Sequence, residues 1–171
     1  MHIREEQPED AEGIRAVNDA AFGGGDESAL IDRLRGDDLL VVTLIAEEYG
    51  EIVAHIAFSE LEVTSNDHKC SIRAAALAPM AVAPTHQRLG IGSELVRQGI
   101  EKCRENGIEA VIVVGHERFY PRFGFSAEIA ECLKSPFSGP FCMALPLKHE
   151  VFDDFRGFVI YPDAFGVENT E

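Results

Sequence analysis

The sequence predicts a single α/β domain built on a mixed β-sheet. Long apolar runs follow one another between residues 39 and 82, and a strand–helix–strand unit spans residues 71–114. The chain has 171 residues and a mass of 18.8 kDa, which suits one full hydrophobic core and would crowd two. With 46% hydrophobic and 26% charged residues, the composition is that of an ordinary globular protein. We therefore expect one domain over residues 1–171.

The first third of the chain predicts a short strand and two helices. Residues 2–6 have an extended pattern, and Pro8 followed by two acidic residues is typical of a helix N-terminus. The first helix ends at the glycines of residues 23–25. Its apolar face is expected to hold Ile14, Val17, Ala21 and Phe22, and the second helix is expected to have Leu30, Ile31 and Leu34 on one side.

Three strands are expected next, in antiparallel succession. Residues 39–46 are apolar and partly β-branched, and the run 52–63 begins with apolar side chains at every second position, 52, 54, 56 and 58. The polar residues 64–69 predict a hairpin loop, and residues 71–82 form the third strand, which ends before Pro84. These runs account for the antiparallel part of the sheet.

The chain then changes from hairpins to a crossover. Residues 90–106 predict a helix with Ile91, Leu95, Val96, Ile100 and Cys103 on one face, and residues 110–114 are a β-branched run typical of a doubly buried strand. A strand–helix–strand unit implies a parallel pair with a right-handed crossover. A short helix near 118–123 and strands at 141–147 and 158–161 complete the expected elements.

Charge and cysteine content exclude several classes of function. The chain has 15 Lys+Arg against 30 Asp+Glu, a formal charge of −15, which argues against binding nucleic acid or an anionic membrane surface. No apolar run approaches the roughly 20 residues that span a bilayer, and the polar start does not resemble a signal or transit peptide. The four cysteines form no Cys-x-x-Cys pair, so we expect reduced, mostly packed thiols and a cytoplasmic protein.

The segment between the third strand and the long helix carries most of the chemical information. Gly90 and Gly92 fall in the first turn of the helix, where each glycine costs about 1 kcal/mol relative to alanine. Free N–H groups at a helix start bind anions, and a phosphate approaches them only where side chains are absent. The segment lacks the Lys of a Walker A loop, and Leu95 stands where a Rossmann fingerprint needs its third glycine. A tight, closely packed turn without a ligand is the alternative explanation.

The pattern Gln/Arg-x-x-Gly-x-Gly/Ala, filled by Gln87, Gly90 and Gly92, resembles the acetyl-CoA signature of GNAT-superfamily N-acetyltransferases. In that family a parallel strand and a Tyr-x-Lys/Arg-x-Gly-Phe segment follow, and this chain has Tyr120-Pro121-Arg122-Phe123-Gly124-Phe125 at the matching place. Together with Gly115-His116, this segment resembles a bacterial subgroup of predicted acetyltransferases. The resemblance implies a GNAT-like domain: a mixed, mostly antiparallel sheet with a central splayed parallel strand pair, flanked by helices.

The resemblance also implies which residues bind acetyl-CoA as the co-substrate. The backbone of the strand end pairs with the pantetheine arm, and one N–H there faces the thioester oxygen. The glycine turn wraps the pyrophosphate. The strand residues are Met80, Ala81 and Val82, and the turn residues are Gln87, Arg88, Leu89, Gly90, Ile91, Gly92 and Ser93.

Tyr120 occupies the family's general-acid position, where a phenol of pKa near 10 can protonate the departing thiolate. The acceptor amine must lose its proton before it attacks, and the sequence offers Glu60 and His116 as two candidate bases. Either one can instead be a purely structural residue. The histidines show no metal-ligand spacing, so no metal is expected.

The resemblance implies direct acetyl transfer from acetyl-CoA to an amine in a ternary complex. Two alternatives stay open: a module that binds CoA without turnover, and transfer of a longer acyl chain into space left by the alanines of residues 74–78. A homodimer is also open. Residues 1–38 hold four basic and eleven acidic side chains, and in this family that end helps to shape the acceptor side, which hints at a cationic acceptor.

Overall fold

The computed structural model describes residues 1–170, which divide into two compact units. Unit 1 comprises Met1–Ser59 and Ala78–Lys102, and unit 2 comprises Glu60–Leu77 and the chain from Cys103 onward. Two long strands, β3 (Glu51–Ser65) and β4 (Ser71–Val82), each give one part to either unit. Both strands therefore run from one unit into the other.

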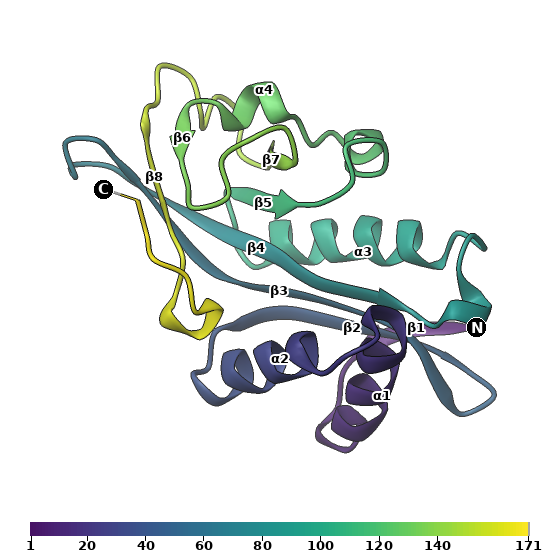
Figure 1. Cartoon of the computed structure of the whole chain (residues 1–171). Coiled ribbons are helices and arrows are strands. Elements are labelled where there is room, and N and C mark those ends of the chain that lie inside the picture. The colour runs from purple at the N-terminus through teal and green to yellow at the C-terminus, as the bar shows by residue number, and fades with distance from the viewer. Residues whose placement is uncertain (171) are drawn as a thin grey trace. The chain divides into compact units, whose positions relative to one another are not determined.

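Unit 1 consists of an antiparallel sheet with helices on both faces. Strand β1 (His2–Glu5) pairs with β2 (Leu40–Glu48), and β2 pairs with the first part of β3, so that Ile45 lies opposite both Arg4 and His55. Helices α1 (Ala11–Phe22) and α2 (Asp26–Gly36) lie beneath the strands in Figure 1, and α3 (Ile91–Glu105) lies above them. Short 3₁₀ turns at Pro8–Asp10 and Pro84–His86 precede α1 and α3.

The face that α1 presents to the sheet differs from the prediction in one position. Ile14 and Val17 are buried as expected, and Ile14 packs with Ile31 and Ile45. Phe22, however, is 47% exposed, so its assignment to the buried face was wrong. Phe22 is the last residue of α1, next to the left-handed cap at Gly23, and the buried position one turn earlier is taken by Asn18. Asn18 satisfies one polar group by donating from Nδ2 to the Ile14 carbonyl at 2.9 Å.

Unit 2 holds the parallel strand pair. Residues Ala74–Leu77 of β4 pair in parallel with Ala110–Val113 of β5 (Ala110–Val114), and β5 pairs antiparallel with β7 (Cys142–Pro146). Strand β8 (Gly157–Ile160) pairs antiparallel with β3 and parallel with the short β6 (Leu133–Lys134). The predicted mixed sheet with a parallel pair is therefore confirmed.

The long elements match their predicted bounds better than the short ones. Strands β4 and β5 agree to the residue, whereas β3 runs on to Ser65 because the Ser65 N–H donates to the Cys70 carbonyl at 2.8 Å and closes a tighter hairpin than expected. The short helix near 118–123 is a 3₁₀ turn at Tyr120–Phe123. Helix α4 (Ala127–Ala130) and β6 were not predicted, since elements of four and two residues are too short to show a hydrophobic period.

The cysteines are all free thiols. Cys103 and Cys142 are buried, Cys132 is half-buried and Cys70 is exposed. Burial raises the pKa of the Cys103 thiol to about 12, so this thiol packs as a small apolar group. Within residues 1–170, none of the helices combines the length and the apolar character needed to cross a lipid bilayer.

Candidate active site

The turn before α3, in unit 1, has an unusual backbone. Arg88 and Gly90 both adopt left-handed conformations, with φ of 63° and 84°. The Gln87 side chain donates to the Val82 carbonyl at 3.1 Å, which ties the turn back to the end of β4. The first helical bond runs from the Glu94 N–H to the Gly90 carbonyl at 3.1 Å. The N–H groups of the first turn of α3 have no intrahelical partner and are available to an anion.

The two glycines of this turn have different reasons for lacking a side chain. Gly90 is exposed, and its left-handed backbone strains any L side chain. Gly92 has an ordinary backbone, but a Cβ there would lie 3.5 Å from Val82 Cγ2 and 3.6 Å from Met80 Cε. A side chain longer than a methyl group would therefore displace the end of β4. Local packing at Gly92 thus limits the size of the side chain, and the exposed backbone around Gly90 is the part that can receive a ligand.

The last residues of β4 leave the parallel ladder before the strand ends. The ladder to β5 stops at Leu77, and Pro79, two residues later, has no N–H to contribute to it. The strand continues to Val82, and the N–H of the following Ala83 donates to the Val53 carbonyl at 2.8 Å. Ala81 is buried, whereas Met80 and Val82 are half-buried.

Tyr120 lies in unit 2, on the 3₁₀ turn after β5. Its side chain is buried, and its ring makes edge contacts with Phe119 and Phe125 at centroid distances of 5.0 and 5.6 Å. Burial raises the pKa of the Tyr120 phenol to about 12, so the hydroxyl stays protonated at neutral pH. Gly124 closes the turn in a left-handed conformation, with a φ of 97°. The residue thus keeps the proton that a general acid must deliver.

The two candidate bases lie in different surroundings within unit 2. His116 is exposed, and its backbone carbonyl accepts the N–H groups of Phe119 at 3.1 Å and Tyr120 at 3.4 Å, so His116 begins the turn that carries the tyrosine. Glu60 is partly buried and ion-paired with Arg73 at 2.5 Å between Oε1 and Nη2. The Glu60 carboxylate raises the pKa of the Arg73 guanidinium.

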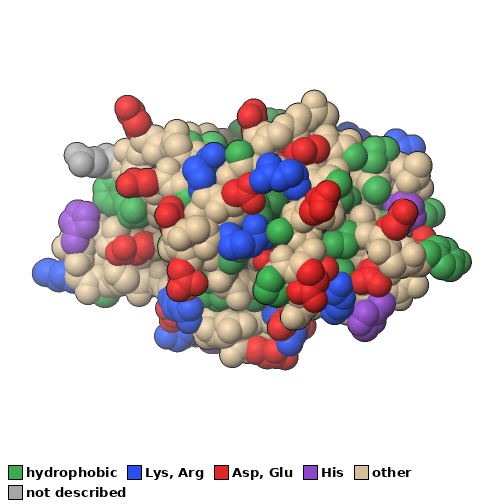
Figure 2. All heavy atoms as spheres, turned by 90° about the horizontal axis from the view of Figure 1, so that it is seen from below, with side chains coloured by type: hydrophobic (Ala, Val, Ile, Leu, Met, Phe, Trp, Pro, Cys, Tyr) green, Lys and Arg blue, Asp and Glu red, His purple; other side chains and the backbone are tan. Residues whose placement is uncertain are grey.

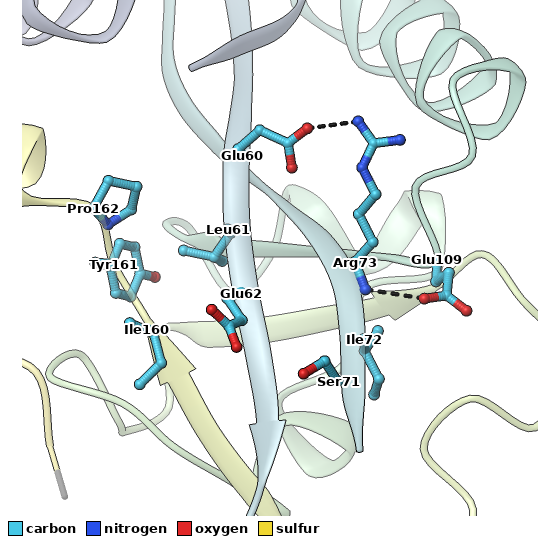
Figure 3. A pocket seen from close by; sticks show the side chains of 10 residues that line it. All are labelled: Glu60, Leu61, Glu62, Ser71, Ile72, Arg73, Glu109, Ile160, Tyr161 and Pro162. Carbon is cyan, nitrogen blue, oxygen red and sulfur yellow. Dashed lines mark hydrogen bonds and ion pairs between the residues drawn. The ribbon is translucent and has the colours of Figure 1, made fainter. Parts of the chain in front are cut away.

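Glu60 lines an open cavity of about 510 Å³ in unit 2 (Figure 3). The Arg73 side chain extends from β4 to Glu60 on β3, and the Arg73 backbone N–H donates to a Glu109 carboxylate oxygen at 2.9 Å. Sequence reasoning did not single out Arg73, although opposite charges on two strands of a predicted hairpin are a usable signal. The lining residues are Glu60, Leu61, Glu62, Ser71, Ile72, Arg73, Glu109, Ile160, Tyr161 and Pro162. Across residues 1–170, no three His, Cys, Asp or Glu side chains gather in a way that could hold a metal ion.

Comparisons with known proteins agree with this arrangement. A family model described as an acetyltransferase (GNAT) domain matches residues 2–127. The uncharacterized N-acetyltransferase YjhQ of Escherichia coli is 38% identical over 127 residues, which are 73% of this chain and 68% of that protein.

Two solved structures extend the similarity to nearly the whole chain. The GNAT family N-acetyltransferase YhbS of Escherichia coli, in complex with CoA, has a TM-score of 0.88 at 28% identity and covers 97% of this chain and 92% of its own. A GNAT family acetyltransferase from Brucella melitensis, in complex with acetyl-CoA, has a TM-score of 0.79 at 32% identity and covers 96% and 97%. This chain therefore belongs to the GNAT acetyltransferases and is an acetyl-CoA-dependent N-acetyltransferase.

Proposed function

We propose that the protein transfers the acetyl group by direct attack of an amine on acetyl-CoA in a ternary complex, with Tyr120 as the general acid. The observation that carries the proposal is the buried, protonated phenol on the turn that follows the parallel strand pair. Thiolate is the group that leaves when the amine attacks the thioester carbon. A phenol aimed at the sulfur transfers its proton as the C–S bond breaks, and a positioned acid of this kind contributes about 100- to 10,000-fold in rate.

The cofactor part of the proposal rests on unit 1. The exposed turn with left-handed residues at Arg88 and Gly90 leaves backbone N–H groups uncovered at the start of α3, as a pyrophosphate requires. The end of β4 extends past its ladder with β5 and can pair with the amides of pantetheine. We assign CoA binding to Met80, Ala81, Val82, Gln87, Arg88, Leu89, Gly90, Ile91, Gly92 and Ser93.

The proton acceptor for the amine is proposed among His116 and Glu60. His116 is exposed and close in sequence to Tyr120, so its imidazole can take a proton from the amine and pass it to solvent. Glu60 has one carboxylate oxygen on Arg73, and only its other oxygen is left for a proton. The test replaces each residue separately, as His116→Ala and Glu60→Gln, and compares the acetylation rate of each variant with that of the wild type. The base is the residue whose replacement lowers the rate most at low pH, where less of the amine is already neutral.

The experiment that tests the role of Tyr120 is release of free CoA thiol by the wild type and by Tyr120→Phe across a panel of amines. We expect Tyr120→Phe to bind acetyl-CoA normally and to lower kcat by at least 100-fold. Tyr49→Phe, at a tyrosine that is 99% exposed, serves as the matched control and should keep the wild-type activity. Equal turnover in Tyr120→Phe and the wild type would remove Tyr120 from the mechanism.

We further propose that the acceptor is cationic. The basic side chains of residues 1–38 are largely neutralised inside the unit: Arg4 binds Asp10 at 2.6 Å and Glu47 at 2.9 Å, Arg15 binds Asp32, and Arg35 binds Glu6 at 3.1 Å. Helices α1 and α2, at the bottom of Figure 1, face the viewer in Figure 2, where acidic and basic side chains are interspersed. The acids in excess of these pairs give the segment its net negative charge.

A negative field of this kind raises the local concentration of cations, and added salt screens it. We expect amines that carry a second positive charge to have lower KM values than neutral or acidic amines, and we expect that advantage to shrink between 50 and 500 mM salt. Preference for a neutral acceptor at low salt would refute the proposal. We also propose a cytoplasmic setting, in line with the four free thiols.

A further inference from the structure

Gly115, directly after β5, lies against the ring of Tyr120. A Cβ built on Gly115 would stand 2.5 Å from Tyr120 Cε2 and 3.2 Å from Cδ2. Carbon atoms in contact normally lie about 3.5 to 4.0 Å apart. The ring therefore occupies the volume in which every other amino acid would place its first side-chain carbon.

The backbone of Gly115 is anchored, so it cannot give way to the ring. Its N–H donates to the Phe141 carbonyl at 3.0 Å, one residue before β7 begins. One residue earlier, Val114 pairs with Cys142 in the β5–β7 ladder. A methyl group at Gly115 would thus push on the tyrosine rather than shift the strand.

Two aromatic residues also contact the Tyr120 ring. Phe119 and Phe125 meet the ring edge-on, at interplanar angles of 86° and 74°, and Phe125 is itself 2% exposed. Arg122 lies over the Phe119 ring at 4.7 Å and donates from Nε to the Phe119 carbonyl at 3.3 Å, which fixes that neighbour in turn. The Tyr120 ring thus occupies the space left free by Gly115 and contacts the rings of Phe119 and Phe125.

We propose that Gly115 is a positioning residue for acetyl transfer: the absence of its side chain sets where the Tyr120 ring lies and hence where the hydroxyl points. The inference rests on the proposed role of Tyr120 and adds a residue that does not touch the reacting atoms. Among the glycines, only Gly115 has the Tyr120 ring at its Cβ position, whereas a control glycine such as Gly36 has no atom within 4 Å of a Cβ.

The geometry gives the size of the effect. Restoring an ordinary contact from 2.5 Å requires the ring to move by about 1 Å. A misplacement of about 1 Å in a catalytic group costs about 100-fold in rate. We expect Gly115→Ala to lower kcat by about 10- to 100-fold and to leave KM for acetyl-CoA unchanged, since the residues assigned to CoA lie on β4 and α3.

The decisive experiment is a double-mutant cycle on kcat, with thiol release as the assay and Gly36→Ala as the matched glycine-to-alanine control. The ring of Phe at position 120 meets the added methyl group as Tyr does, but it carries no proton. Gly115→Ala should therefore cost 10- to 100-fold in the wild type and less than 2-fold in the Tyr120→Phe background. Gly36→Ala should leave kcat unchanged in both backgrounds.

An equal loss in both backgrounds would mean a purely structural effect and would overturn the proposal, as would full activity of folded Gly115→Ala. If Gly115→Ala does not fold, Phe125→Leu decides: it removes one of the rings that contact Tyr120 without adding atoms, and it should lower kcat several-fold in the wild type only. Unchanged kcat in folded Phe125→Leu would then refute the inference. Failure of the Tyr120 role itself has a separate signature, which is wild-type turnover by Tyr120→Phe alone.

Discussion

Gly99, in the middle of α3, gives a prediction whose sign depends on tertiary structure. Replacing a glycine by alanine inside a helix normally stabilises it by about 1 kcal/mol. In unit 1, however, α3 lies directly on Phe58, and a Cβ at Gly99 would stand 2.6 Å from Phe58 Cζ and closer still to Cε2. Phe58 has no exposed surface and cannot swing into solvent. The gain in helix propensity therefore competes with a steric clash in the core.

The steric clash costs more free energy than the gain in helix propensity returns. An ordinary contact requires the ring or the helix to move by about 1 Å, and overpacking of a close-packed core typically costs 1 to 3 kcal/mol. Since the ring is fully buried, we take about 3 kcal/mol for the clash and offset it by about 1 kcal/mol of helix propensity. Gly99→Ala should lower the free energy of unfolding by about 2 kcal/mol.

The assay is urea unfolding followed by far-UV circular dichroism, with Gly36→Ala as the control. Gly36, at the end of α2, has open space around its Cβ position, so its replacement should raise the free energy of unfolding by up to about 1 kcal/mol. Phe58→Leu combined with Gly99→Ala should cost less than the sum of the two single changes, because the smaller side chain makes room. A free energy of unfolding at or above the wild-type value in Gly99→Ala would refute the reasoning.

Two further predictions concern a buried histidine and the glycine turn. His55 has no exposed surface, and its Nδ1 lies 3.2 Å from Asn18 Nδ2. Burial lowers the pKa of His55 below 6.5, although the Glu6 carboxylate, 3.8 Å from Nε2, raises it. Between the two pKa values the unfolded chain binds a proton that the folded protein does not, so the free energy of unfolding should fall as the pH drops below about 6.5. Urea titrations from pH 7 to pH 5 should show this slope in the wild type and lose it in His55→Gln; equal slopes would contradict the assignment. At Gly90, where φ is 84°, Gly90→Val should raise KM for acetyl-CoA at least 10-fold and Gly90→Asn far less, because Asn tolerates the left-handed backbone. Matching KM values for the two variants would show that this backbone conformation is not needed for binding.

The acceptor and the base are where sequence reasoning reached its limit. An amine substrate is recognised by side chains drawn from several loops, and none of these loops carries a local pattern that spacing can reveal. Glu60 illustrates the difficulty: the sequence left it open between a base and a structural residue, and in the structure it is ion-paired with Arg73 on the next strand. Whether such a group is free depends on a partner 13 residues away along the chain.

The sequence by itself determined the order of the long elements, the glycine turn before α3, the parallel strand pair and the family. These features follow from the spacing of apolar residues along each element and from short motifs, which are local properties of the sequence. Strands β4 and β5 could be read to the residue, since a polar loop before residue 71 and Pro84 bound β4, and β5 is one apolar run that ends at Gly115. Tertiary structure decided what surrounds each group. Phe22 turned out to be exposed, and Gly99 and Gly115 turned out to make room for Phe58 and Tyr120. The residues next to Gly99 and Gly115 in the sequence do not show that a side chain would clash there, because the clashing ring reaches each glycine only when the chain is folded.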